Sequence, residues 1–142
     1  LDVNKINYEI SSNLELNTNE NDVIVINTTG LLNSLYKKSK ASFIGGSLFS
    51  KYGGHNIIEA ASNKSPFIVG PYMKNFEDIL NLFLEREACL QLQHPNDLCE
   101  AYKKLLKNDE LRGHIIDNAL KVVSENKGSS NKQYKHIKNL IN

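Results

Sequence analysis

The sequence predicts an α/β protein with a mostly parallel sheet flanked by helices. Short apolar runs rich in β-branched residues alternate with stretches of helical spacing, which is the pattern of consecutive strand–helix units. The length of 142 residues corresponds to about one ordinary domain. With 40% hydrophobic and 23% charged residues, the composition is that of a globular chain.

The first part of the chain is expected to hold three strands and one helix. Residues 5–11 form a plausible strand, and the Asn-rich stretch 13–21 that follows is typical of a loop. Residues 23–26 are a continuous β-branched run, as buried parallel strands require. Leucine and tyrosine then recur at helical spacing over 31–40, and residues 41–44 make a second strand of the buried type.

The middle of the chain continues the same alternation. Residues 55–61 predict a short helix, and residues 66–69 form the next buried strand. A further helix is expected to start after Asn75, where apolar residues recur at helical spacing. Residues 88–92 then make a short strand.

The last 50 residues or so are expected to be almost entirely helical. Asp97 and Asp109 are each suited to cap a helix, and Gly128 is expected to end the second one. A final amphipathic stretch lies within residues 128–142. This is more helix than one face of a sheet needs, so part of it is expected to pack against something outside this chain.

The balanced charge argues against several classes of partner. Lysine and arginine number 17 against 16 aspartate and glutamate residues, so the charge gives no reason to expect a nucleic acid or an anionic membrane. No apolar run is long enough for a transmembrane helix. Arg86 and Arg112 are the only arginines, so an anion site is expected to use backbone N–H groups, helix ends or lysine. The cysteines, Cys89 and Cys99, are expected to be reduced and buried.

The strongest candidate site is a glycine-rich loop between the strand at 41–44 and the helix after it. In open α/β sheets, ligands bind at the carboxyl ends of the strands, and glycine lets the backbone approach a ligand closely. A helix N-terminus also offers unpaired N–H groups to an anion. Two glycine pairs before a His-Asn-x-x-Glu string therefore favour a bound anion over a plain connection. The loop residues are Gly45, Gly46, Ser47, Gly53, Gly54 and His55.

The side chains that follow the second glycine pair could bind a sugar. Asn56 and Glu59 are three residues apart, so both are expected on one face of the first helical turn. A carboxylate there can accept two hydrogen bonds from a sugar diol, and an amide both donates and accepts. Glu59 could instead only compensate the helix dipole. His55 could equally contact a ligand or cap the helix. A metal site at His55 is not expected, because no Cys, His or carboxylate lies near it at the spacing of metal ligands.

Two further connections belong to the same predicted edge of the sheet, at residues 27–30 and 70–76. Because the carboxyl ends of parallel strands meet at one edge, we expect all three connections to build one site. The chain has no Gly-x-Ser-x-Gly elbow, no Walker loop and no Cys–His pair in reach.

Taken in order, these motifs resemble the C-terminal domain of the 3-deoxy-D-manno-octulosonic acid (Kdo) transferases. The resemblance rests on Phe-Ile-Gly-Gly-Ser-Leu, Gly-Gly-His-Asn-x-x-Glu-Ala-Ala and Pro-Phe-x-x-Gly-Pro with a following Asn-Phe, and it covers about residues 23–126. The two double-glycine strings separate this family from other GT-B glycosyltransferases. The resemblance implies a single Rossmann-like, nucleotide-sugar-binding domain over residues 1–142, the C-terminal half of a GT-B fold.

The resemblance also implies a function and partners. In this family the C-terminal domain binds the donor CMP-Kdo, while the N-terminal domain holds a lipid A precursor and carries the general base of an inverting transfer. No catalytic residue, metal or cofactor is then expected in this chain, and residues 128–142 would pack toward the N-terminal domain. The whole protein would lie at the cytoplasmic face of the bacterial inner membrane. This chain would be a soluble fragment or split gene product, without the family's first strand–helix unit.

Carried over by position, the resemblance assigns donor contacts and exposes a departure. The family usually has Asp-Thr-Met-Gly-Glu-Leu where this chain has Asn-Thr-Thr-Gly-Leu-Leu, so carboxylates are missing at Asn27 and Leu31. Two main hypotheses follow: the donor half of a Kdo transferase, or a non-catalytic nucleotide-binding remnant of one. Another GT-B activity with a different nucleotide sugar is a third. The assigned donor contacts are Thr29, Gly30, Leu31, Asn56, Ile57, Ile58 and Glu59.

Overall fold

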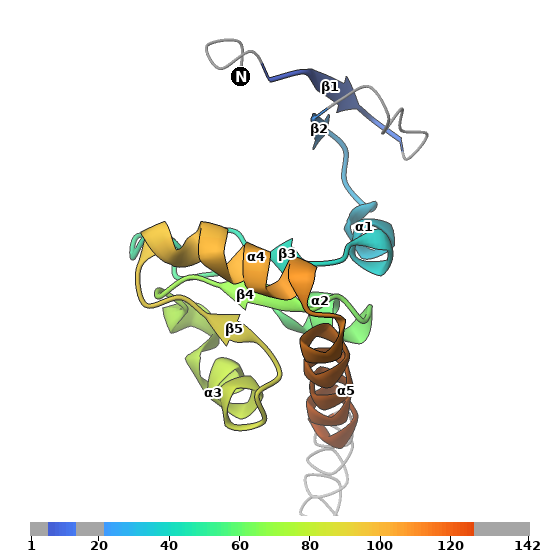
Figure 1. Ribbon diagram of the computed structural model, residues 1–142. Coiled ribbons are helices and arrows are strands. Elements are labelled where there is room, and N and C mark those ends of the chain that lie inside the picture. The colour runs from blue at the N-terminus through green and yellow to red at the C-terminus, as the bar shows by residue number, and fades with distance from the viewer. Residues whose placement is uncertain (1–5, 14–21, 127–142) are drawn as a thin grey trace, which may run out of the picture. The chain divides into compact units, whose positions relative to one another are not determined.

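The computed structural model describes residues 6–13 and 22–126, and it shows strands and helices in the predicted alternation (Figure 1). Contacts within the chain divide it into two compact units, residues 1–35 and 36–142. The single domain expected over residues 1–142 therefore stays a prediction. The expected final helix within 128–142 lies outside the described residues.

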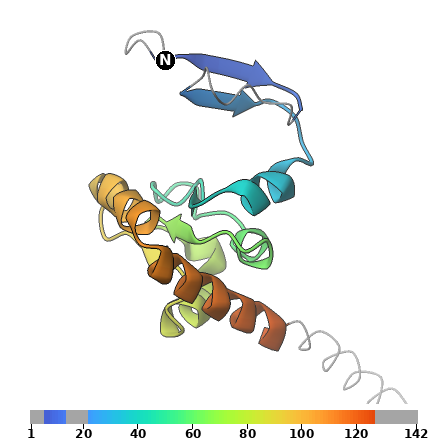
Figure 2. The same cartoon turned by 45° about the vertical axis from the view of Figure 1, so that its right-hand side comes forward.

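The N-terminal unit holds a two-stranded parallel sheet. Strand β1 (Tyr8–Ser11) pairs with β2 (Val23–Ile26), with Tyr8 opposite Val23 and Ser11 opposite Ile26 (Figure 2). The Asn27 N–H donates to the Ser11 carbonyl at 3.1 Å and extends the ladder by one bond. Residues 27–31 then lead into α1 (Leu32–Lys38), so the strand–helix connection predicted at this position is confirmed.

The C-terminal unit is built on a three-stranded parallel sheet. Its strands are β3 (Ser42–Phe43), β4 (Phe67–Val69) and β5 (Leu90–Gln91), in the order β3-β4-β5. The central strand β4 is buried along its whole length. This burial explains its unbroken apolar run, because a parallel strand covered on both faces has no solvent side for polar residues.

One face of this sheet packs against two helices. Side chains alternate along a strand, so Phe67 and Val69 point to the same side. There they join a core cluster with residues of α2 (Ile58–Ser62) and α3 (Glu77–Glu85). The rings of Phe67 and Phe83 meet edge to face, with centroids 5.6 Å apart.

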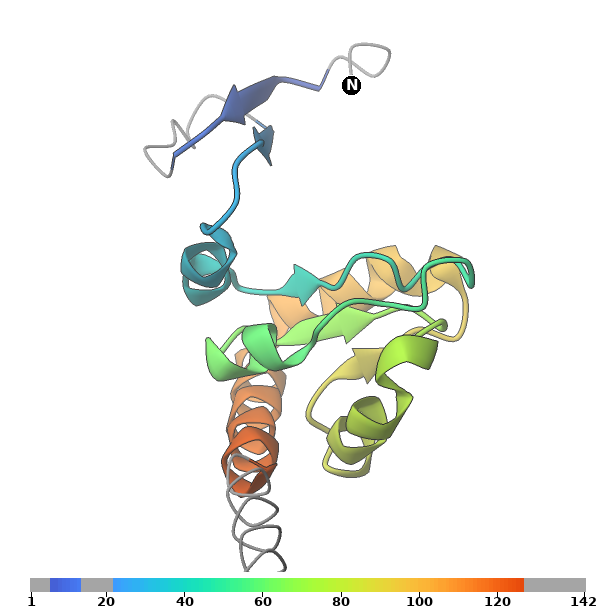
Figure 3. The same ribbon diagram turned by 180° about the vertical axis from the view of Figure 1, so that it is seen from behind.

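The opposite face is covered by the helices that end the described chain. Ile68 packs there with Leu105 of α4 (Leu98–Lys107) and with Ile115 of α5 (Asp109–Asn126). Figure 3 shows α4 on the side of β4 that faces away from α3. Further along α5, the buried residues belong to the other cluster, so this helix packs against the helices of both layers. The predicted α/β fold with helices flanking a parallel sheet is confirmed.

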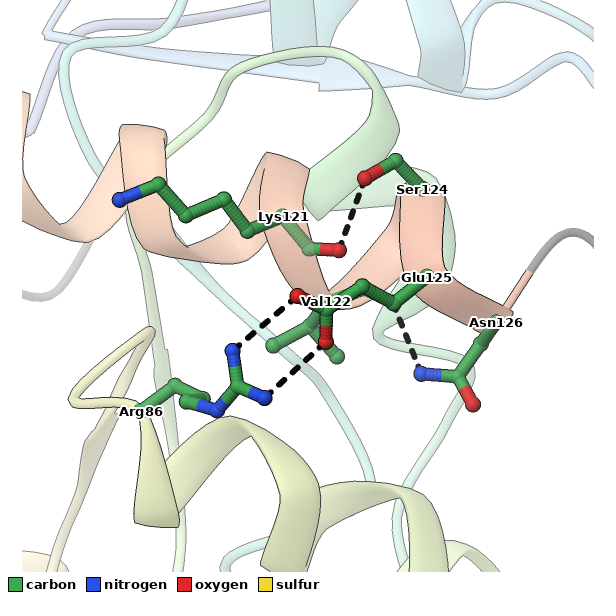
Figure 4. A network of polar contacts seen from close by, with 6 residues as sticks. All are labelled: Arg86, Lys121, Val122, Ser124, Glu125 and Asn126. Carbon is green, nitrogen blue, oxygen red and sulfur yellow. Dashed lines mark hydrogen bonds and ion pairs between the residues drawn. The ribbon is translucent and has the colours of Figure 1, made fainter.

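A polar clamp joins the end of α3 to α5. The Arg86 guanidinium donates to both carboxylate oxygens of Glu125, at 3.3 and 3.0 Å (Figure 4). The Asn118 amide donates to the Arg86 carbonyl at 2.7 Å. Because both charged side chains are about half exposed, the contribution of this ion pair to stability is small.

Two predicted helix caps are corrected. The Asp97 carboxylate accepts the His94 N–H at 3.0 Å and so closes the turn η3 (Pro95–Asp97) rather than capping α4. Asn108, not Asp109, caps α5, because its side-chain oxygen accepts the Leu111 N–H at 2.9 Å. At α5 the neighbouring Asn108 takes the backbone donor expected for Asp109, and at Asp97 the carboxylate bonds backward to His94 instead of forward to α4; spacing alone resolves neither choice.

The two cysteines differ in environment. Cys89 is buried as predicted, and burial raises its pKa to about 12. Cys99 is exposed, so the expectation of a second buried thiol is wrong. In the part of the chain that the structure describes, no helix is both long and apolar enough to cross a membrane.

Candidate functional site

Two of the three predicted loops lie together at the carboxyl edge of the sheet in the C-terminal unit. Residues 44–57 connect β3 to α2, and residues 70–73 connect β4 to the short helical turn η2 (Lys74–Phe76). The Tyr72 N–H donates to the Ser47 carbonyl at 3.0 Å, which joins the two connections directly. The third predicted loop, with Thr29, Gly30 and Leu31, belongs to the N-terminal unit, and its part in a common site stays a prediction.

The Ser47 hydroxyl is used by the fold. It is completely buried, donates to the Ile44 carbonyl at 2.5 Å and accepts the Gly70 N–H at 2.8 Å. A Cβ on Gly70 would collide with the backbone carbonyl of Ser47. The side chain of Ser47 therefore holds two strand ends together, and the residue has no exposed atom with which to contact a ligand as predicted.

The second glycine pair is buried and tightly packed. Gly54 has a φ of +83°, and its N–H donates to the Gly46 carbonyl at 2.9 Å, which closes the loop on itself. A Cβ on Gly54 would overlap the Met73 sulfur, so glycine is required there by space as well as by backbone conformation. Gly45, by contrast, is exposed and has open space around it. Close packing, not only an approaching ligand, thus accounts for glycine at positions 53 and 54.

The helix after this loop begins later than predicted. Helix α2 starts at Ile58, not at residue 55, and Asn56 precedes it. The Asn56 side-chain oxygen accepts the Ile58 N–H at 2.9 Å, a local turn that asparagine favours ahead of a helix. Asn56 and Glu59 therefore do not share a helical turn, and one N–H expected to face an anion is already bonded.

The neighbours of Asn56 take different positions from those predicted. His55 makes no capping bond to α2, and its ring lies over Gly46, where a Cβ would come within 2.6 Å of the imidazole Nδ1. The exposed His55 ring leaves its ligand role as the remaining alternative. Ile57 is completely buried in the core, backbone included, so the predicted donor contact at this residue is wrong. The side chain of Ile58 is 41% exposed.

Glu59 carries a carboxylate without a protein partner. The residue is half-buried in the first turn of α2, and its carboxylate forms no hydrogen bond or ion pair with another described residue. The pKa of the Tyr36 phenol is raised, mainly by burial and to a lesser extent by the negative charge of Glu59. Together with the amide NH₂ of Asn56, the Glu59 carboxylate offers one acceptor and one donor group beside the glycine loop.

A hollow of about 380 Å³ opens beside the connection from β4 to η2. Its lining includes Tyr72 from that connection, Lys74 from η2, Glu77 from α3 and Gln91 at the end of β5. Lys74 is a cation free to reach an anion, since it makes no ion pair within the described residues. Across residues 6–13 and 22–126, no group of three or more His, Cys, Asp and Glu side chains could hold a metal ion.

Comparisons with known proteins place this architecture. No protein-family model matches the chain. The 3-deoxy-D-manno-octulosonic acid transferase of Haemophilus influenzae is 32% identical over 126 residues, which is 88% of this chain and 29% of that protein. The enzyme of the same name from Rickettsia typhi is 36% identical over 107 residues, 74% of this chain and 23% of its own length. This chain thus spans less than a third of these relatives.

A solved structure matches the fold as well as the sequence. The crystal structure of the C-terminal CMP-Kdo binding domain of WaaA from Acinetobacter baumannii superposes with a TM-score of 0.79 and 28% sequence identity. The match covers 86% of this chain and 63% of that one. The expected C-terminal half of a GT-B fold is thereby confirmed. By sequence and by fold, this chain belongs to the 3-deoxy-D-manno-octulosonic acid transferase family and corresponds to its C-terminal domain.

Proposed function

We propose that this chain binds CMP-Kdo as the donor-binding domain of a Kdo transferase. The observation that carries the proposal is the similarity to the C-terminal CMP-Kdo binding domain from Acinetobacter baumannii over 86% of the chain. The geometry of the site agrees with it. The partnerless carboxylate of Glu59 and the amide of Asn56 stand next to a rigid glycine loop, and a carboxylate of this kind suits the hydroxyls of a ribose.

Donor binding is proposed to use backbone groups where carboxylates are missing. With leucine at position 31 and asparagine at 27, the connection at 27–31 has no acid to offer. Thr29, Gly30 and Leu31 would then act through N–H and C=O groups, as would Ile58, which is exposed. If a side-chain acid were required there, the chain would be a remnant that no longer binds the donor.

Titration calorimetry with CMP, UMP and AMP tests this proposal. CMP and UMP differ only at the pyrimidine edge, so they separate recognition of cytosine from general nucleotide binding. We expect CMP to bind more tightly than UMP and AMP. Equal heats for all three, or none, would contradict the cytidine assignment.

In the whole protein, this domain is proposed to act beside an N-terminal domain at the cytoplasmic face of the inner membrane. That domain would hold the lipid A precursor and supply the base of an inverting transfer, with residues 128–142 packing toward it. Transfer needs the acceptor oxygen aligned with the anomeric carbon, and such positioning contributes roughly 7–11 kcal/mol. The isolated chain is therefore expected to transfer no Kdo to a lipid A precursor. Product above the enzyme-free blank in a mass-spectrometric assay would contradict this division of labour.

A further inference from the structure

Asn75 ties the two loops of the site together through three separate contacts. It lies in the middle of η2, in the segment that follows β4. Its backbone N–H donates to the Gly53 carbonyl at 3.0 Å. Its side-chain NH₂ donates to the Tyr52 carbonyl at 3.0 Å. One residue thus holds two consecutive carbonyls of the glycine loop.

The third contact of Asn75 is steric. Gly53 has a φ of +68°, and a Cβ built on it would lie 2.8–2.9 Å from three atoms of the Asn75 amide. The amide therefore occupies the space that a side chain at residue 53 would need. Met73 occupies the corresponding space at Gly54. Both residues of the second glycine pair are therefore packed against the segment that follows β4, Gly53 by Asn75 and Gly54 by Met73.

We call Asn75 and its contacts to Tyr52 and Gly53 the brace, and its position determines which parts of the site it can affect. The loop that it holds leads directly into His55 and Asn56 and then into α2, which carries Glu59. At its other end the same loop is tied by Ser47 to Gly70, at the start of the Asn75 segment. With both ends fixed, the orientation of Asn56 relative to Glu59 is set before any ligand arrives, and such preorganisation raises affinity by lowering the ordering cost of binding.

We propose that Asn75 is a positioning residue that holds the glycine loop at 52–54 in its ligand-binding geometry without touching the ligand itself. The effect on nucleotide affinity rests on the proposed function, whereas the effect on the loop can be measured without any ligand. The side chain of Asn75 is exposed, so its removal should leave the core intact.

Three variants test the brace. Asn75→Ala removes the amide, and Asn75→Asp keeps its size but replaces the N–H donor that faces the Tyr52 carbonyl. Asn118→Ala is the matched control, because that amide also donates to a backbone carbonyl, but at the end of α3. Amide hydrogen exchange of Gly54 and thermal unfolding are measured on all three, and CMP titration follows.

In both Asn75 variants the Gly54 amide hydrogen should exchange at least about tenfold faster than in the wild type, and CMP should bind about tenfold more weakly. The unfolding temperatures should stay close to that of the wild type. Asn118→Ala should change neither the exchange of Gly54 nor the affinity. Unchanged Gly54 exchange in both Asn75 variants would overturn the brace whatever the affinity. Faster exchange with unchanged CMP affinity would overturn the positioning role. A wild type that binds no CMP would refute the proposed function while the exchange data still decide on the brace.

Gly53→Ala offers a second measurement that depends on the same contact. The added methyl group must displace the Asn75 amide and break its bond to the Tyr52 carbonyl. Gly53→Ala and Asn75→Ala should therefore raise Gly54 exchange by amounts that do not multiply in the double variant. Fully multiplicative effects would show that the two residues act independently, and the brace would fall.

Discussion

Replacing Glu59 by glutamine separates a ligand-binding role from a structural one. The carboxylate is half-buried and has no hydrogen bond or ion pair to another described residue, so its loss leaves no protein group unsatisfied. What the fold loses is the favourable interaction with the N-terminus of α2, about 0.3–1 kcal/mol. What a bound nucleotide would lose is hydrogen bonding to a charged acceptor, about 1.5–3 kcal/mol, which corresponds to roughly 10- to 150-fold in Kd.

Two measurements on Glu59→Gln check this reasoning. Calorimetric titration with CMP should show the weaker binding. The free energy of unfolding, measured in urea, should change by less than about 1 kcal/mol. Glu85→Gln, at the exposed end of α3, is the control and should change neither. A large loss of stability with unchanged CMP affinity would show that Glu59 is structural.

Tyr36 gives an independent signal for the same variant. Burial and the charge of Glu59 both raise the pKa of this phenol. In Glu59→Gln the contribution of the charge disappears and that of burial remains, so the pKa of Tyr36 should fall. Nuclear magnetic resonance titration of the tyrosine ring carbons measures it, and an unchanged pKa would show that the two groups are not close in solution.

Three further predictions concern stability. Ser47→Ala removes a buried hydroxyl that donates to the Ile44 carbonyl and accepts the Gly70 N–H. Each backbone group left without its partner costs about 1–3 kcal/mol, so the free energy of unfolding in urea should fall clearly. An unchanged unfolding midpoint would show that the Ser47 hydroxyl does not hold the two strand ends together. Burial raises the pKa of Cys89 from 9.0 to about 12, so the stability that its neutral thiol contributes is fully present below pH 9 and is lost as the pH rises from 9 toward 12. In Cys89→Ala the free energy of unfolding should therefore decline less steeply with pH over this range. The same pH dependence in both proteins would contradict this prediction. Arg86→Met breaks a half-exposed ion pair and should cost less than about 1 kcal/mol, so a loss of several kcal/mol would show that the clamp matters more than its exposure implies.

The strand–helix alternation could be predicted because it depends on patterns that the fold leaves visible in the sequence. The run at 66–69 predicts a buried strand, and β4 is covered on both faces. Helix ends were harder to predict. Asp109 and Asn108 are both good capping residues, and only the geometry of the turn decides that Asn108 accepts the Leu111 N–H. In the same way the turn made by Asn56 delays the start of α2 by three residues.

The site could be predicted as a set of loops but not as a set of roles. The glycine string and the segment after β4 were expected to converge, and in the C-terminal unit they do. The sequence does not show that Ser47 turns inward, or that Gly53 and Gly54 are packed by residues some twenty positions further on. Such contacts depend on tertiary structure, although the predicted connection at 70–76 and its Asn-Phe motif pointed to the segment that makes them.

Resonance mapping of CMP on the isotopically labelled chain tests the central claim most directly. Backbone amide signals are followed while CMP is added, with UMP added in a parallel experiment. Donor binding predicts saturable shifts concentrated in residues 29–31 and 53–59, at lower concentrations of CMP than of UMP. Shifts that are absent, that lie away from both segments, or that are the same for both nucleotides would contradict donor binding.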